Sequence, residues 1–360
     1  GEWKKVRLGE ICNMLCGYAF NGEDIVEQGS YLLMRGINIT EGSIRHSSEL
    51  DRYYSGSIEK LDKYKLAVGD LVIGMDGSKV GRNSAIVSSY EDGSYLVQRV
   101  CRIKSSIGNN YILQFINNTK FHQYVDTVKT SSAIPHISLG DIQNFRISIP
   151  PTQDETDKIA KLFLLLDERI ATQNKIIERL ETLIKGITQN ITLHNKPNVR
   201  ISECLECTSS TLQESDALRS GTYPVYGANG IVGYLDNYST QDEAVYIIKD
   251  GSGVGTVSYV TGQCSTTGTL NTLQAKEGYS LQYLYYILKV FNFEPYKTGM
   301  AIPHIYFKDY GKAKIFCPSY TKQLQYARLL SAIDGKVSTE QNSLASLSLQ
   351  KQYLLRQMFI

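Results

Sequence analysis

The sequence lacks the features that mark membrane-spanning and disulfide-rich secreted proteins. No apolar run approaches the roughly 20 residues that a helix needs to cross a bilayer, and no signal peptide opens the chain. The seven cysteines form no even, regular framework, which is typical of a protein from a reducing cytoplasm. We therefore expect a cytoplasmic protein with no membrane partner.

The chain also lacks an excess of charge of one sign. It carries 38 Lys and Arg against 36 Asp and Glu, a formal net charge of +2, which is no strong footprint of nucleic-acid binding. If the chain binds DNA, its positive residues must be concentrated on one face. The 25 tyrosines suit a recognition surface because Tyr has an apolar body and a polar tip, although most are explained more simply as half-buried strand residues.

An internal repeat is the main feature that the sequence does contain. The segment KTSSAIPHIS at residues 129–138 returns as KTGMAIPHIY at residues 297–306, with seven of ten positions identical. Downstream, Asp141 and Asp309 keep the same offset. Upstream, MDGSKVG at residues 75–81 resembles KDGSGVG, which begins at Lys249. A repeat of this length indicates a duplicated structural unit.

Each repeated motif leads into a long amphipathic segment whose apolar positions recur every 3.5 residues, as in a coiled coil. The two segments share this seam at an offset of 167, so we predict two long helices, the first over residues 153–190.

The polar residues Gln173 and Glu340 occupy equivalent seam positions, where they either fix the register or face a bound subunit. Lys351 interrupts an apolar row and is expected to snorkel near a helix end. The predicted seam comprises Ile159, Leu166, Ile170, Ile177, Leu180, Ile184, Ile333, Val337, Leu344, Leu347 and Leu354, and the same periodic rows include Leu162 and Leu329.

The segments before the helices read as two globular domains that differ in sequence. Alternating apolar residues between Gly-Ser turns predict short strands, as in residues 95–103 and 244–249, with short helices at 111–118 and 281–288. We expect an α/β fold of the α+β kind, in which two mixed, strand-rich domains are each followed by a long helix. The predicted limits are 1–151 and 196–318 for the domains, and 152–195 and 319–360 for the helices.

This order of elements resembles the specificity subunit of type I restriction–modification systems, over essentially the whole chain. The most specific elements are the loop-strand-helix entries AIPHISLGDIQNFRISIPPTQDE and AIPHIYFKDYGKAKIFCPSYTKQ. The family usually has a Glu-Gln pair at the start of each helix. This chain has Asp154-Glu155 in the first copy and Lys322-Gln323 in the second, so the match at the helix entry is partial.

The resemblance implies a protein with no catalytic site and no cofactor of its own. Each variable domain would be a target recognition domain that reads one half of a split target in double-stranded DNA. The two helices would pair as an antiparallel coiled coil and hold the domains apart, related by a pseudo-two-fold axis. Two modification subunits, which carry S-adenosylmethionine, would dock on this frame, and restriction subunits with translocase and nuclease activity would join them. Because the two domains differ, the target should be asymmetric.

Sequence readout needs Arg or Lys for guanine edges and Asn or Gln for adenine, held on loops or strand ends. Several loops of both domains offer these residues, although for any single residue an ordinary surface loop accounts for it equally well. The candidates of the first domain are Arg35, Asn38, Lys79, Arg82, Asn83, Gln98 and Arg99. Those of the second domain are Tyr226, Asn229, Lys249, Ser252, Thr266, Thr267 and Asn271.

Lys129-Thr130 and Lys297-Thr298 are candidates for phosphate contacts, because they recur while the flanking domains differ and phosphate contacts carry no sequence information. A structural turn before the last strand of each domain accounts for them equally well. His136 and His304 lack further ligands at a fitting spacing and read as structural. The pair Cys204 and Cys207 has zinc-type spacing but stands alone, so no metal is expected.

Two rival classes of protein fit the sequence less well. An enzyme acting on DNA, with an unrecognised catalytic site, is disfavoured because no proline is followed by Asp and no Asn-Pro-Pro-Tyr or Asp-Pro-Pro-Tyr string is present. A coiled-coil adaptor that binds only proteins is disfavoured because an adaptor gains nothing from two different Gly- and Tyr-rich domains.

Overall fold

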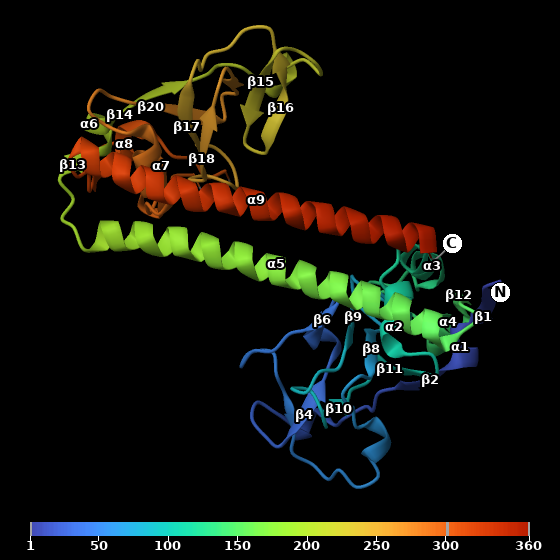
Figure 1. Cartoon of the computed structure of the whole chain (residues 1–360). Helices are drawn as coiled ribbons and strands as arrows, with labels where there is room; N and C mark the ends of the chain where they lie inside the picture. The colour runs from blue at the N-terminus through green and yellow to red at the C-terminus, as the bar shows by residue number, and fades with distance from the viewer. Residues whose placement is uncertain (1, 300–301, 359–360) are drawn as a thin grey trace. The chain divides into compact units, whose positions relative to one another are not determined.

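The computed structural model describes residues 2–299 and 302–358 of the chain (Figure 1). Close contacts divide the chain into unit 1, residues 1–172 and 344–360, and unit 2, residues 173–343. Met300 and Ala301 of the second repeated motif, and the last two residues of the predicted second helix, lie outside the described residues. The predicted domain limits remain predictions, because each unit contains part of both long helices. Among the described residues, no helix is long and apolar enough to cross a membrane.

Unit 1 contains the mixed helices and strands that the sequence predicts. Its main sheet has the order β2-β11-β8-β9 and is antiparallel throughout. A second sheet has the order β10-β4-β7-β3, while β1 pairs with β12 and β5 with β6. The strands are β1 Lys4–Arg7, β2 Cys12–Cys16, β3 Ile25–Val26, β4 Tyr31–Met34, β5 Ile39–Thr40, β6 Ser43–Ile44, β7 Tyr53–Tyr54, β8 Leu71–Gly74, β9 Ser84–Ile86, β10 Tyr95–Leu96, β11 Val100–Ser105 and β12 Arg146–Ile149. The helices before α5 are α1 Leu8–Ile11, α2 Asn109–Ile116, α3 Thr119–Val128 and α4 Leu139–Asn144.

The sequence explains where these elements begin. Strand β8 reads LVIG and is buried at every position, as expected for the middle of a sheet. Ser138, the last residue of the first repeated motif, caps α4 by accepting a hydrogen bond from the backbone N–H of Asp141, whose carboxylate accepts one from the N–H of Ser138. The Asp141 of the repeat is therefore half of a capping box.

Unit 2 is built around a four-stranded antiparallel sheet with the order β14-β20-β17-β18. If the four strands of each main sheet are numbered in chain order, the sheets of both units have the order 1-4-2-3. A three-stranded sheet, β16-β15-β19, lies outside it, and β13 pairs with β21 as β1 does with β12. The strands are β13 Val199–Arg200, β14 Leu205–Ser209, β15 Tyr223–Gly227, β16 Gly230–Leu235, β17 Glu243–Ile248, β18 Val257–Thr261, β19 Ser265–Thr266, β20 Leu270–Ala275 and β21 Lys314–Ile315. The helices before α9 are α6 Ile201–Cys204, α7 Leu281–Lys289 and α8 Phe307–Tyr310.

The two long helices are α5, Gln153–Leu193, and α9, Tyr320–Met358. The seam residues Ile159, Leu166, Ile177, Ile184 and Val337 are buried. The remaining predicted seam residues are partly buried, and they are Ile170, Leu180, Ile333, Leu344, Leu347 and Leu354. Inside unit 2, the Gln173 amide donates hydrogen bonds to the carboxylate and the backbone carbonyl of Glu340. The two polar seam positions therefore face each other in this structure.

Two expectations about the helices are wrong. Leu162 and Leu329 are 41% and 50% exposed, while their neighbours Phe163 and Leu330 are fully buried. Near the start of α5, packing on the core of unit 1, which includes Phe163, decides which face is buried, so the seven-residue pattern does not hold there. Lys351 does not snorkel, because its side chain is only 18% exposed and forms an ion pair with Asp167 inside unit 1.

Most tyrosines are buried or partly buried, as the simpler interpretation predicts, but most of them do not lie in strands. The largest fully buried side chains include Tyr95, Tyr111, Tyr246, Tyr283, Tyr286 and Tyr310. Some of their hydroxyls donate to backbone carbonyls, such as Tyr111 to the Ser148 carbonyl at 2.9 Å and Tyr283 to the Phe316 carbonyl at 2.8 Å. These residues build the cores and are not available for recognition.

Candidate nucleic-acid interface

The repeated motifs meet in space, and they meet in the same way in each unit. In unit 1, the Gly77 N–H donates to the Pro135 carbonyl at 3.0 Å and the Ile137 N–H donates to the Met75 carbonyl at 3.0 Å. In unit 2, the Gly251 N–H donates to the Pro303 carbonyl at 2.9 Å and the Ile305 N–H donates to the Lys249 carbonyl at 2.9 Å. We call each pair of motifs the latch of its unit.

Glycine is required at the end of the first motif of each latch. Gly81 and Gly255 have φ values of +71° and +89°, which side chains rarely adopt. A Cβ at Gly81 would lie 2.8 Å from Val125 Cγ2, and one at Gly255 would lie 3.1 Å from the Phe293 Cβ. The motif therefore recurs because the latch needs this backbone shape and this close approach.

Beside the latch of unit 1 lies a cavity of about 680 Å³, which we call the basic cavity. Three separate segments of the chain line it. They bring together five of the seven residues that the sequence offers as candidates for DNA readout in this domain. Its lining residues are Arg35, Gly36, Ile37, Ile39, Thr40, Arg45, Asp76, Gly77, Ser78, Lys79, Asn83, Val97, Gln98 and Arg99. Four basic side chains stand against one carboxylate, so positive charge is concentrated here although the chain as a whole is nearly neutral.

Arg99 has a strained backbone at the edge of the basic cavity. Its φ is +66°, in the left-handed region, although it is not a glycine. Its backbone carbonyl accepts the Met75 N–H at 2.9 Å, and its guanidinium lies 3.6 Å from the Asp76 carboxylate. The side chain is still 58% exposed. Strain of this kind, maintained by surrounding contacts, is typical of functional positions.

Arg45 also belongs to the basic cavity, although sequence reasoning does not single it out. The β5-β6 hairpin turns the chain back on itself, and the Arg45 Nε donates to the Ile37 carbonyl at 3.0 Å. The short turn after Thr40, with Gly42 at φ +81°, is the signal that could have predicted this return.

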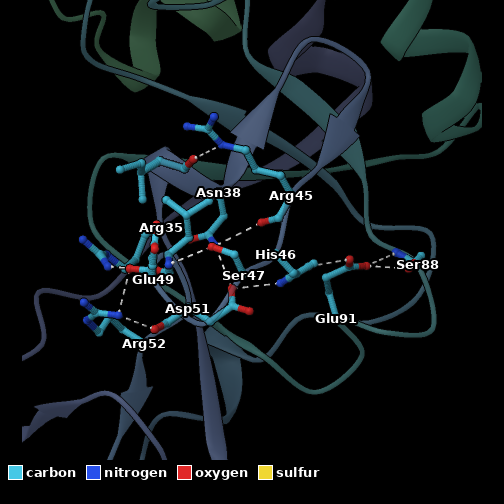
Figure 2. A network of polar contacts seen from close by, with 12 residues as sticks. Arg35, Asn38, Arg45, His46, Ser47, Glu49, Asp51, Arg52, Ser88 and Glu91 are labelled. Carbon is cyan, nitrogen blue, oxygen red and sulfur yellow. Dashed lines mark hydrogen bonds and ion pairs between the residues drawn. The ribbon is translucent and has the colours of Figure 1, made fainter. Parts of the chain in front are cut away.

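A buried polar network holds the loop that carries Arg45, as Figure 2 shows. The Asn38 amide donates to the Arg45 carbonyl at 3.3 Å and to the Asp51 carboxylate at 3.0 Å. The two ring nitrogens of His46 lie 2.9 Å from the Asp51 and Glu91 carboxylates. This network fixes the backbone that carries Arg45, so ordering this loop adds little to the entropy cost of binding.

Glu91 anchors the far end of the network. Burial raises the pKa of its carboxyl, but hydrogen bonds from Ser88 and His46 outweigh burial and hold the pKa below its ordinary value. Glu91 is therefore ionised at neutral pH, and its carboxylate faces the His46 ring.

Some predicted readers have structural roles instead. Asn38 is 1% exposed and belongs to the network just described. In unit 2, Thr266, Thr267 and Asn271 are at most 3% exposed and bond to Thr272, Thr269 and Tyr310 inside the domain. Side chains enclosed in this way cannot contact a base edge in this conformation. These residues support the surface and do not form it.

The Lys-Thr pairs of the repeat each have intramolecular partners. Lys129 pairs with Asp126, and Lys297 pairs with Glu294, each at 2.6 Å. The Thr130 hydroxyl lies 3.0 Å from His136 Nδ1, while the Thr298 N–H donates to the His304 carbonyl at 2.9 Å. A structural turn accounts for all of these contacts, and the phosphate contacts remain predictions.

The other candidates lie outside the basic cavity. In unit 1, the Arg82 guanidinium pairs with Asp126 at 2.8 Å. In unit 2, Asn229 and Ser252 are exposed, and Lys249 is partly exposed within the latch. Tyr226 is partly exposed at a break in the register of β15 with β16.

The described residues give no support for a zinc site at Cys204 and Cys207. The Cys204 sulfur lies 3.9 Å from the Cys317 sulfur, while burial raises the pKa of the Cys207 thiol to about 11. Across the described part of the chain, no three His, Cys, Asp or Glu side chains gather as metal ligands would.

Comparison with known families accounts for both halves of the chain. Residues 1–182 and 196–349 match the family described as the type I restriction modification DNA specificity domain. The chain belongs to this family. The match includes both latches and the basic cavity, so these features lie within specificity domains.

Curated relatives agree with this assignment over part of their length. The chain is 29% identical over 179 residues to the specificity subunit of the Escherichia coli type I restriction enzyme EcoAI, covering 48% of this chain and 29% of the relative. It is 28% identical over 134 residues to the EcoprrI specificity subunit, also of Escherichia coli, covering 37% and 32%. The chain thus spans about a third of the length of these curated relatives.

Solved structures show that the fold is shared. The crystal structure of a type I restriction–modification S subunit from M. genitalium has a TM-score of 0.72 at 16% identity and covers 100% of this chain and 96% of that one. A second structure, described as the structural basis underlying complex assembly and conformational transition of the type I R-M system, has a TM-score of 0.51 at 16% identity, with 98% and 96% covered.

Proposed function

We propose that this chain is the non-catalytic specificity subunit of a type I restriction–modification complex, and that each of its two recognition domains reads one half of a split, asymmetric DNA target. The observation that carries the proposal is that both units hold the same sheet order and the same latch, while the loops beside the latch differ. Two domains that share a backbone arrangement but differ in their surface loops are suited to recognising two different half-sites.

In unit 1 the basic cavity supplies the chemistry of readout. The guanidinium groups of Arg35, Arg45 and Arg99 suit the O6 and N7 acceptors of guanine, while the amides of Asn83 and Gln98 suit adenine. In unit 2 the corresponding candidates are Asn229 and Ser252 on turns, Lys249 in the latch and Tyr226 in strand β15.

The long helices supply the frame. We propose that α5 and α9 form an antiparallel coiled coil and that the duplicated halves are related by a pseudo-two-fold axis. This arrangement would separate the half-sites by about one turn of DNA, 10–10.5 base pairs, as in dimeric readers. Two modification subunits, which bring S-adenosylmethionine, would dock on the helices, and restriction subunits would complete the complex. The chain itself would need no cofactor.

Methylation mapping tests the proposal. The chain is expressed with the modification subunit encoded beside it in a host free of DNA methylation, and modified adenines are read across the genome. A split, asymmetric motif that disappears when this chain is omitted is the expected result. A continuous motif, or methylation that does not depend on the chain, would overturn the two-reader proposal.

A further inference from the structure

The repeat places an Asp at the same position of a long helix in each unit, but the surroundings of the two carboxylates differ. In unit 1, Asp167 on α5 accepts a hydrogen bond from the Gln114 amide of α2 at 3.3 Å. The same carboxylate forms an ion pair with Lys351, which comes from α9. Lys351 is 18% exposed, so its ammonium is largely enclosed and its charge is neutralised by Asp167.

Unit 2 has the carboxylate but lacks the lysine. The offset of 167 maps Asp167 to Asp334 on α9, and the Tyr286 hydroxyl of α7 donates to Asp334 at 3.3 Å, as Gln114 does to Asp167. The same offset maps Lys351 to Ile184, an apolar residue that is 6% exposed. Among the described residues, no cation forms an ion pair with Asp334.

A cavity of about 410 Å³ lies at this place in unit 2. Ile184, Val337 and Val290 give it an apolar wall, and Asp334 and Tyr286 contribute polar groups. The other charged lining residues, Glu181, Lys185 and Lys289, are solvent-exposed. The ammonium of Lys289 lies over the Tyr285 ring, 5.3 Å from its centroid.

We propose that this cavity receives a lysine or arginine side chain of a partner protein that docks on α5, α7 and α9 in unit 2. The inference rests on the proposed function, which makes the partner a modification subunit. In the part of the chain that the structure describes, the one hydrogen bond to the Asp334 carboxylate comes from a neutral hydroxyl, so a cation would stabilise this partly buried group. The apolar wall suits the methylene stem of such a side chain better than it suits a free metal ion, which would need several oxygen ligands.

Unit 1 shows what the position accepts, because there a lysine of α9, Lys351, forms an ion pair with the Asp167 carboxylate. Since Lys351 already neutralises the carboxylate there, a partner gains an ion pair at this position in unit 2 alone. Two copies of a modification subunit would therefore bind with unequal strength.

The test compares three variants of the full chain for binding to the neighbouring modification subunit, by isothermal titration calorimetry. Asp334→Asn keeps the acceptor for Tyr286 but removes the charge, and it should raise Kd at least about tenfold. Ile184→Lys supplies the internal cation that unit 1 has, so it should raise Kd similarly. Asp167→Asn, the matched control, should change Kd less than about threefold.

Each outcome decides the inference. Unchanged binding by Asp334→Asn overturns it, whatever Ile184→Lys does. Equal losses for Asp334→Asn and Asp167→Asn also overturn it, because the effect is then not specific to the carboxylate of unit 2. If the wild-type chain binds no modification subunit, the proposed function fails, and the inference fails with it. Circular dichroism of each variant separates lost binding from lost folding.

Discussion

At the scale of single residues, the basic cavity brings together arginine and lysine side chains, which would contribute differently to the recognition of DNA. A guanidinium that makes two hydrogen bonds to guanine contributes specificity, whereas a lysine on a phosphate contributes affinity. The Arg45 guanidinium is hydrogen-bonded to the Ile37 carbonyl, whereas the side chains of Arg99 and Lys79 are 58% and 62% exposed and lie beside carboxylates. We therefore expect the arginines to select bases and Lys79 to contact phosphate.

Replacing Arg45 by Ala should weaken binding to the target DNA by about 1–3 kcal/mol and relax the choice of one base pair. Titration of labelled target duplexes against the complex, with each base pair varied in turn, measures both effects. Arg7→Ala is the control, because Arg7 is exposed on β1 and does not line the basic cavity. An equal loss on every duplex would assign Arg45 to the DNA backbone instead.

The network behind Arg45 gives the domain an acid-sensitive contact. The pKa of Glu91 is lower in the folded state than its ordinary value of 4.5, so the folded state binds its proton less readily than the unfolded state does. The resulting stabilisation is present above the unfolded pKa and is lost as the pH falls through the folded pKa. Glu91→Gln should therefore destabilise the protein at neutral pH and reduce the loss of stability below about pH 4.5.

Urea unfolding of Glu91→Gln and wild type at a series of pH values measures this difference. Glu59→Gln serves as the control, because Glu59 is an exposed carboxylate of the same unit. Parallel stability curves for Glu91→Gln and wild type across the acid range would contradict the assigned role.

At the scale of elements, the seam of the long helices depends on apolar positions. Leu180 lies in unit 2 and Leu347 in unit 1, and each is partly buried. Asp at either place would bury a charge without a partner, so each variant should lose about 2–4 kcal/mol of stability and assemble poorly with its partner subunits. Thermal melting and gel filtration with the modification subunit measure the two effects. Leu183→Asp should leave the melting temperature nearly unchanged, because Leu183 is 48% exposed on the same helix.

Replacing a glycine by Ala should destabilise the protein in the latch and stabilise it in a long helix. Gly81→Ala should cost at least about 1 kcal/mol, because φ is positive and Val125 lies too close. A Cβ at Gly186 in α5 would meet no neighbouring atom within 4 Å, so Gly186→Ala should stabilise the protein by up to about 1 kcal/mol. Chemical denaturation of the two variants compares them directly, and destabilisation by Gly186→Ala would contradict the argument from helix propensity.

These elements also show which features a sequence can reveal. Periodicity located both long helices, since two unrelated amphipathic helices would not share a seam at a fixed offset. It failed at Leu162, because tertiary packing of Phe163 on the core of unit 1 overrides the pattern. Residue type indicates which side chains could contact DNA. It does not predict that Arg99 is exposed while Asn38 is buried, because burial depends on how distant segments pack. Arg45 was missed because only the hairpin brings it to the cavity.

At the scale of the whole molecule, the proposed function requires a backbone arrangement that the two units share and recognition surfaces that differ between them. The latches and the sheet order are the same in both units, whereas the basic cavity is lined only by residues of unit 1. A change in one reader should then alter one half of the target and leave the other half unchanged, provided that the frame is preserved.

Methylation mapping of two variants tests this independence. Arg99→Lys should make one half of the methylated motif degenerate, because Lys keeps the charge but cannot form the two parallel hydrogen bonds of a guanidinium. Asn229→Ala, on the exposed turn between β15 and β16 of unit 2, should affect only the other half. The spacing between the halves should be the same in both variants, because neither change touches α5 or α9. If either variant relaxes both halves together, the domains do not read independently, and their recognition must be coupled through the frame that they share.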